Sequence, residues 1–184
     1  METLRLFEQS RHPSGLIYWL SCMARLNQKL GLEQIRTFLE NAPLNQEELL
    51  PYWKFSGSHY HRNLIYGNEH FELLLFCWHR QQSSSIHKHH GSHCGVMVIQ
   101  GTASEERFTA TAHGQLISTE TRDFKAGSIL LNQARDIHKM SNQQPEDLVT
   151  LHLYSPPMRR MDCYNLERET PHYAPQRIQP SMAH

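Results

Sequence analysis

The feature that most constrains the fold is a series of short β-type runs between Trp53 and Tyr154, separated by Gly, Asn, Ser and Asp. No helical apolar period lies between these runs, so a parallel α/β sheet is not indicated. Several short strands at close spacing are typical of an all-β sandwich or barrel. The predicted strands cover residues 60–66, 71–78, 86–89, 94–100, 105–111, 115–118, 128–132, 137–140 and 148–154.

Upstream of the strands, the sequence predicts three short helices. The first begins near Ser14, a good N-cap residue, and ends at Gly31 as its C′ residue. The second ends at 41–43, and the third begins at Asn45, which has a glutamate three residues later, and is limited by Pro51. We expect these helices to cover a barrel and to carry no chemistry. Their apolar stripes are Leu16, Leu20, Met23, Leu26 and Leu30 in the first, and Leu32, Ile35, Phe38 and Leu39 in the second.

A chain of 184 residues is expected to form a single domain. Within it we distinguish an N-terminal helical segment over residues 1–50, a barrel over 51–160 and a C-terminal tail over 161–184. The sequence after Pro157 has prolines at 171, 175 and 180 and little periodicity. We therefore expect it to run over the surface or to be partly disordered.

Composition argues against several classes of protein. Basic and acidic residues balance at 18 each, so no bulk charge points to nucleic acid. No window approaches the roughly 20 apolar residues that span a bilayer, and the N-terminus does not resemble a signal peptide. The four cysteines form no C-x-x-C pair; two disulfides would need an oxidising compartment, and a reducing cytosol fits a chain of this size better. We expect a cytoplasmic monomer that binds neither nucleic acid nor a membrane.

Fourteen histidines are the outlier in the composition, and two of them define a candidate metal site. Because strand side chains alternate between faces, His87 and His89 can present two imidazoles to one ion. A single H-x-H is weak evidence, since imidazole suits several first-row metals. His90 should face away from this pair, and Gly91-Ser92 permits a bend before His93, so we interpret both as non-ligands.

The spacing around this pair resembles the two metal-binding motifs of the cupin superfamily. The first motif is an H-x-H, then an acidic residue, then a Gly; here Cys94 stands at the acidic position and Gly101 follows. The second is a Gly, a Pro-x-Gly, a His and an Asn. The chain keeps Gly127, His138 and Asn142 of the second motif and has Gln133 and Arg135 where the Pro and the second Gly are usual.

A cysteine in place of the acidic ligand resembles the cysteine dioxygenase family of cupins. Further matches lie at residues 60–64, 77–78, 84–87, 92–94 and 151–157, within a similarity that covers roughly 15–160. The resemblance implies an all-β-dominated cupin jelly-roll with short helices outside it. It also implies one mononuclear Fe(II) per chain, O₂, and free L-cysteine as the substrate, oxidised to a sulfinic acid. It weakens after Pro157, so pocket residues from that region cannot be carried over.

The resemblance implies that His87, His89 and His138 bind the iron. Three neutral imidazoles leave the ion its full charge, so it would attract an anionic sulfur, although the motif alone would also accept Zn, Ni or Mn. Arg62 matches the arginine that holds the substrate carboxylate, for which a guanidinium offers a planar fork. Tyr60, on the same strand face, is expected to support it. The alternative for Arg62 is an ordinary surface arginine.

Tyr154 matches the family's active-site tyrosine, whose hydroxyl can hydrogen-bond the substrate or the oxygen species. Cys94 and Tyr154 match a pair that forms a thioether crosslink in some members; the alternative is that Cys94 is only a small buried hydrophobe. The family's Ser–His–Tyr hydrogen-bonded series would be Thr150, His152 and Tyr154 here, and Ser155-Pro156 could be the family's cis peptide. Two other functions stay open: the same chemistry on 3-mercaptopropionate or cysteamine, and a non-catalytic metal-binding cupin.

Overall fold

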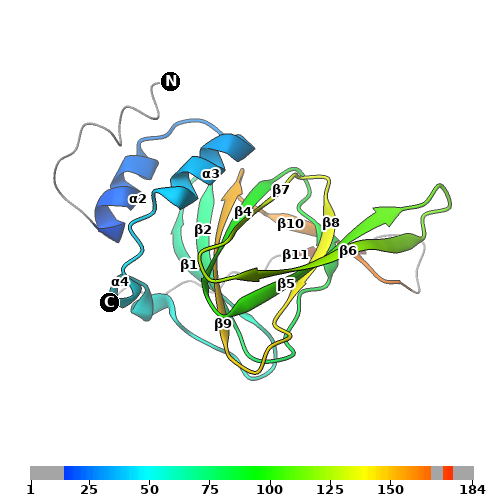
Figure 1. Cartoon of the computed structure of the whole chain (residues 1–184). Helices are drawn as coiled ribbons and strands as arrows, with labels where there is room; N and C mark the ends of the chain where they lie inside the picture. Colours follow the sequence, from blue (N-terminus) through cyan, green and yellow to red (C-terminus); the bar gives the residue numbers. More distant parts are fainter. Residues whose placement is uncertain (1–14, 167–171, 176–184) are drawn as a thin grey trace.

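The computed structural model describes residues 15–166 and 172–175, which form two antiparallel sheets around one interior (Figure 1). The strand-dominated fold and the position of the helices outside it are confirmed. The first sheet has the order β1 (His61–Gly67), β2 (Glu72–Trp78), β9 (Leu148–Ser155), β4 (His93–Gln100) and β7 (Ile129–Asn132). The second has the order β11 (His172–Pro175), β10 (Arg160–Tyr164), β3 (Ile86–Lys88), β8 (Ile137–Ser141), β5 (Thr102–Ala110) and β6 (Leu116–Lys125).

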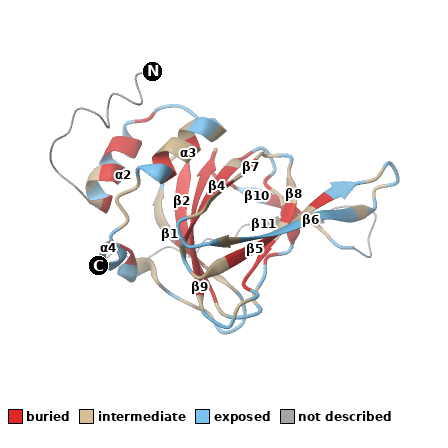
Figure 2. Cartoon of the chain, in the orientation of Figure 1, coloured by how far each residue is buried: buried red, intermediate tan, exposed pale blue. Residues whose placement is uncertain are grey.

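The central strands β2 and β9 of the first sheet are buried on both faces. Leu73 and Leu75 of β2 pack outward with the helices, whereas Leu74 and Phe76 point into the barrel interior. Strand side chains alternate between faces, so a strand covered on both sides becomes a continuous apolar run, as β2 is. Figure 2 shows this buried sheet between the helices and the barrel interior. The helices therefore stabilise the sheet from outside and leave the interior to the site.

Three short helices cover this sheet: α2 (Leu16–Ala24), α3 (Leu32–Glu40) and α4 (Gln46–Leu49), which continues into a 3₁₀ turn over Leu50–Tyr52. The prediction that the first helix extends to Gly31 is wrong. It ends at Ala24, and Gly31 is the N-cap of α3. Leu30 is still buried, but its amide donates to Ser155 Oγ at 2.7 Å instead of continuing a helix. No helix among the described residues is long and apolar enough to cross a membrane.

The helix caps differ in part from the prediction. Ser14 lies outside the described residues, and Gly15 is the N-cap of α2 without a side-chain bond of its own. The Glu48 carboxylate accepts from the Leu16 amide instead, at 3.1 Å to each oxygen. Asn45 caps α4 as expected, by accepting from the Glu47 amide at 3.0 Å. Glu48 thus joins α4 to α2 and is not part of a capping box in its own helix.

Gly95 is required where α3 packs on β4. A Cβ at this position would lie 2.3 Å from Ile35 Cγ2 and 2.7 Å from Leu39 Cδ1, closer than real Cβ contacts. The absence of a side chain lets the helix approach the strand that carries Cys94. The packing of α3 is therefore coupled to the position of a residue that lines the interior.

The predicted strands are all present, but β6 is much longer than expected. The predicted strand ended at residue 118, whereas β6 extends to Lys125 and pairs with β5 along its length. Its residues are mostly exposed and include Glu120 and Arg122, so the sequence contains no apolar run that would indicate a strand here. Together β5 and β6 form a hairpin that projects from the barrel (Figure 1).

The prediction that the chain beyond Pro157 runs over the surface is wrong for β10, whose residues are mostly buried. Both β10 and β11 belong to the second sheet. β10 pairs with β3, so that Cys163 lies opposite His87. Asp162 is only 4% exposed, with Lys88 Nζ at 3.4 Å and His90 Nδ1 at 2.9 Å from its carboxylate. Because β10 contains this buried aspartate, whose partners lie far away in the sequence, its residues show no apolar alternation that would predict a buried strand. Residues 167–171 and 176–184 of the predicted tail lie outside the described residues.

Candidate active site

Three histidines meet inside the barrel. His87 on β3 lies directly opposite His138 on β8, and His89 follows β3 on the same side of the chain. Their ring nitrogens lie within 4.8 Å of one another, and none of the three side chains is more than 5% exposed. Pairing of β3 with β8 therefore brings together the candidate ligands that the sequence predicted.

Hydrogen bonds set the orientation of two of these imidazoles. His87 Nδ1 contacts the Ser85 carbonyl oxygen at 2.9 Å, and His138 Nδ1 contacts Glu105 Oε1 at 2.8 Å. Carbonyl and carboxylate oxygens only accept, so both rings carry their proton on Nδ1 and direct the Nε2 lone pair inward. The Nε2 atoms of His89 and His138 are 3.0 Å apart. Two nitrogens bound at right angles to one ion, at about 2.1 Å each, have about this separation. The cluster suits a mononuclear metal site.

Two of the imidazoles are held in the form that binds metal. Burial, together with the neighbouring His138, lowers the pKa of His87 to about 3. Burial and both other rings hold the pKa of His89 well below its ordinary value. Neutral imidazole is the ligand form, so His87 and His89 need not lose a proton at neutral pH. His90 contacts Asp162 instead, and neither His90 nor His93 belongs to the cluster.

The three histidines line a small pocket that Arg62 also lines. Arg62 is 8% exposed and lies over the Phe76 ring with its guanidinium carbon 4.9 Å from the centroid. Within the described part of the chain, its Nε and Nη2 have no hydrogen-bond partner. A buried cation with free donors is costly unless an anion supplies acceptors. Arg62 is thus not a surface arginine, and its donors have the geometry that suits a carboxylate.

Tyr60 lies beside this guanidinium. Its hydroxyl hydrogen-bonds Arg62, and its ring stacks on Trp78 with centroids 4.1 Å apart. Burial raises the pKa of the Tyr60 hydroxyl, although the Arg62 charge opposes the shift. Tyr60 is therefore a protonated neighbour of the arginine, in the position that the sequence predicted for it.

Cys94 and Tyr154 occupy directly opposite positions on β4 and β9. Both side chains are buried and line the pocket, and the Cys94 thiol donates to the Gly95 carbonyl oxygen at 3.6 Å. Burial raises the pKa of the Cys94 thiol and holds that of Tyr154 well above its ordinary value. Both groups are therefore protonated at neutral pH, on neighbouring strands.

A chain of buried hydrogen bonds leads to Tyr154. Trp78 Nε1 donates to Thr150 Oγ1 at 3.0 Å, and Thr150 Oγ1 lies 2.8 Å from His152 Nε2. Indole only donates, so Thr150 Oγ1 accepts from Trp78 and can give its own proton to His152 Nε2, an arrangement that places the His152 proton on Nδ1. Nδ1 lies 3.3 Å from the Tyr154 hydroxyl oxygen, to which it would then donate. In this arrangement the Tyr154 proton points away from His152 and toward the pocket.

The predicted Thr–His–Tyr series is thus present, and the Ser155-Pro156 peptide is cis. Asn142 of the second motif does not reach the pocket. Its amide donates to the carbonyl oxygens of Trp78, at 3.3 Å, and Glu146, at 2.8 Å. It therefore holds the turn between β8 and β9.

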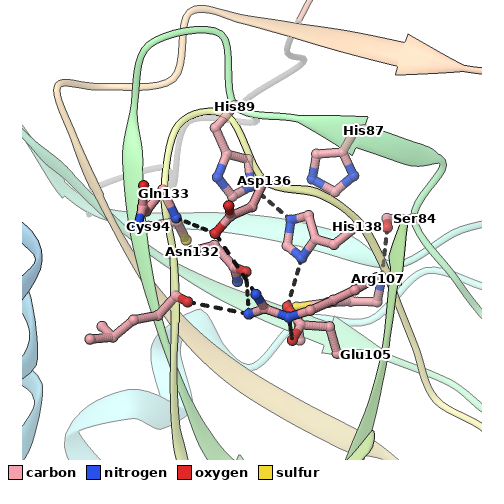
Figure 3. Close-up of polar contacts among 12 residues, drawn as sticks. Ser84, His87, His89, Cys94, Glu105, Arg107, Asn132, Gln133, Asp136 and His138 are labelled. Carbon is pink, nitrogen blue, oxygen red and sulfur yellow. Dashed lines mark hydrogen bonds and ion pairs between the residues drawn. The ribbon is translucent and has the colours of Figure 1, made fainter. Parts of the chain in front are cut away.

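The structure adds two groups that sequence reasoning missed. Glu105 and Arg107 of β5 lie behind His138 (Figure 3). Met158 and Met161 form part of the pocket wall, from the segment assigned to the surface or the edge of the barrel. The only local signal for Glu105 was an acidic residue on a predicted strand. Its partner depends on the register of β5 and β8, which the sequence does not show.

Comparisons with known proteins agree with this geometry. The model of the family "Cysteine dioxygenase type I" matches residues 10–167. Cysteine dioxygenase type 1 of Rattus norvegicus is 32% identical over 149 residues, which cover 78% of this chain and 74% of the relative. The Danio rerio protein of that name is 29% identical over 155 residues, with the same two coverages. Among solved structures, TT1209 from Thermus thermophilus matches with 15% identity and a TM-score of 0.51, over 59% of this chain and 94% of that one, which supports the fold alone.

Proposed function

This chain belongs to the cysteine dioxygenase type I family, and from that premise we propose that it is an Fe(II)-dependent cysteine dioxygenase. It would oxidise the thiol of L-cysteine to the sulfinic acid with both atoms of O₂. Family membership supports a dioxygenase; the substrate and the iron are our inference. The observation that carries it is one buried pocket that combines three imidazoles with a guanidinium whose Nε and Nη2 have no partner among the described residues.

His87, His89 and His138 would hold the iron through their Nε2 atoms. When bound, Fe(II) supplies open positions and a positive charge that attract an anionic sulfur and O₂. The thiol itself provides the electrons, so no external reductant enters the balance. Cys94 stands where other cupins have an acidic ligand, and its raised pKa keeps it neutral. The protein thus adds no negative charge among these ligands to compete with the substrate thiolate.

Arg62 would bind the substrate carboxylate as a bidentate pair, with Tyr60 beside it. The Phe76 ring supports the guanidinium from one side, and burial excludes water that would compete for its donors. Fixing the carboxylate at one end of a small amino thiol directs its sulfur toward the histidines. Such orientation removes much of the entropic cost of bringing the reactants together.

Tyr154 would donate its proton to atoms that gain negative charge during the reaction. His152 would orient it by donating Nδ1–H to the phenol oxygen across the 3.3 Å contact, so the tyrosine would act as a donor and not as a base. The directly paired positions of Cys94 and Tyr154 on β4 and β9 also support the proposal that a thioether crosslink joins them. Such a bond would hold the phenol in place.

Oxygen uptake by anaerobically iron-loaded protein tests the proposal. We expect turnover with L-cysteine to exceed that with 3-mercaptopropionate, and cysteamine, which lacks a carboxylate, to be the poorest substrate. His138→Ala should abolish uptake. Faster turnover with 3-mercaptopropionate would show that this thiol, and not cysteine, is the substrate. No oxygen uptake with any thiol would indicate a non-catalytic metal-binding cupin.

We also propose that the enzyme works as a cytoplasmic monomer. All four cysteines are free and buried, as suits a reducing compartment. Light scattering on the purified protein and fractionation of the source cells test the two statements separately.

A further inference from the structure

Glu105 is a buried carboxylate directly behind the third histidine. It is 2% exposed on β5, and Oε1 lies 2.8 Å from Nδ1 of His138, which is 1% exposed (Figure 3). Its other oxygen, Oε2, lies 3.1 Å from Nε of Arg107. Neither residue lines the pocket, so neither can touch a substrate there.

The Glu105 carboxylate determines which nitrogen of His138 carries the proton and how the ring is oriented. A carboxylate only accepts, so it keeps the imidazole proton on Nδ1 and the lone pair on Nε2, directed at the other two histidines. It also fixes the rotation of the ring and increases the basicity of the nitrogen on the other side. His89 lacks such support from the described residues, among which its buried Nδ1 has no hydrogen-bond partner.

Arg107 connects this carboxylate to the turn that precedes His138. Its Nη2 donates to Asn132 Oδ1 at 3.0 Å, and its Nη1 lies 3.9 Å from Asp136 Oδ2. The same Asp136 oxygen accepts from the Gln133 amide at 2.8 Å. The turn spans the positions where the cupin motif usually has its Pro and second Gly, and here side-chain bonds hold it instead.

We propose that Glu105 and Arg107 are positioning residues for the third metal ligand. Glu105 orients the His138 ring and its proton, while Arg107 holds Glu105 and the preceding turn in one arrangement. The inference rests on the proposed function in one respect, that His138 binds the metal. It predicts that changes in this pair alter metal affinity although neither side chain reaches the pocket.

Glu105→Gln is the sharpest variant because it preserves the shape but not the hydrogen-bonding pattern. The amide offers one accepting and one donating end, whereas both His138 Nδ1–H and Arg107 Nε–H need an acceptor. Either the arginine loses its acceptor, or the amide NH₂ faces the ring and shifts the His138 proton to Nε2, which blocks the lone pair. Glu106→Gln is the matched control, since its side chain points to the opposite face of β5.

Affinity for Ni(II) alone, measured by competition with a chromophoric chelator, tests the proposal without turnover. We expect Glu105→Gln to bind Ni(II) about 10- to 100-fold more weakly than wild type, and Glu106→Gln to match wild type. In metal-free protein, ¹⁵N NMR should find the His138 proton on Nδ1 in wild type and redistributed in Glu105→Gln. A purely structural ion pair would move neither readout.

Unchanged Ni(II) affinity in folded Glu105→Gln would overturn the positioning role, as would a wild-type His138 proton on Nε2. If Glu105→Gln does not fold, Arg107→Gln replaces it, and unchanged affinity in that variant is equally decisive. His138→Ala distinguishes the proposed metal site from the proposed positioning role. If His138→Ala abolishes Ni(II) binding while Glu105→Gln does not weaken it, the metal site is supported and the positioning role is wrong. If His138→Ala leaves binding unchanged, the proposed metal site is wrong.

Discussion

Replacing Thr150 by valine should break the hydrogen-bond series behind Tyr154 at its centre. The Thr150 side chain is fully buried, and its hydroxyl accepts from Trp78 Nε1 at 3.0 Å and lies 2.8 Å from His152 Nε2, to which we expect it to donate. Valine has nearly the same shape but offers neither function. The variant therefore leaves an indole N–H and an imidazole nitrogen without partners inside the barrel.

The size of the effect follows from these two groups. A buried polar group that loses its partner costs about 1–3 kcal/mol, so two cost about 2–6 kcal/mol. The added buried methyl offsets about 1 kcal/mol. We expect a net loss of about 3 kcal/mol in the free energy of unfolding. Thr150→Ser keeps the hydroxyl and loses one methyl, so it should cost only about 1 kcal/mol.

Urea denaturation of metal-free wild type, Thr150→Val and Thr150→Ser measures these differences, with equal slopes as the check on two-state behaviour. In ¹⁵N NMR, the wild-type His152 proton should reside on Nδ1, because Thr150 donates to Nε2. Thr150→Val should lose this preference and Thr150→Ser should keep it. Equal stability of the two variants, or a wild-type proton on Nε2, would refute the directional series.

Three further predictions concern packing, acid stability and the crosslink. Gly95→Ala should cost about 1–3 kcal/mol in urea unfolding, since its Cβ would lie 2.3 Å from α3, whereas Gly67→Ala, whose Cβ meets its nearest neighbour at 3.7 Å, should cost little. The pKa of His87 is lowered from 6.5 to about 3, so the unfolded state of the metal-free protein binds more protons below pH 6.5. Lowering the pH from 7.5 to 5 should then remove about 2 kcal/mol of unfolding free energy through this group, and an unchanged urea midpoint would contradict it. After turnover, intact-mass analysis should show a loss of two hydrogens that Cys94→Ala and Tyr154→Phe both abolish; an unchanged wild-type mass excludes the crosslink.

The local sequence pattern was sufficient to predict features that belong to a single helix or strand. Short apolar runs between turn residues predicted the strands, because alternation and turn chemistry act over a few residues. The same reasoning extended the first helix too far, since Leu26 and Leu30 keep a helical spacing while lying beyond its end at Ala24. It also missed most of β6 and all of β10, whose exposed or compensated charges give no apolar period.

Within the site, the sequence by itself determined which residue types are present and their spacing: His87 and His89 two apart on a strand, and His138 through its motif. The tertiary structure alone decided that Arg62 is buried with free donors and that Glu105 lies behind His138. The physical reason is that burial and cross-strand neighbours depend on which strands pair and in which register. Those pairings join residues tens of positions apart, and local pattern does not specify them.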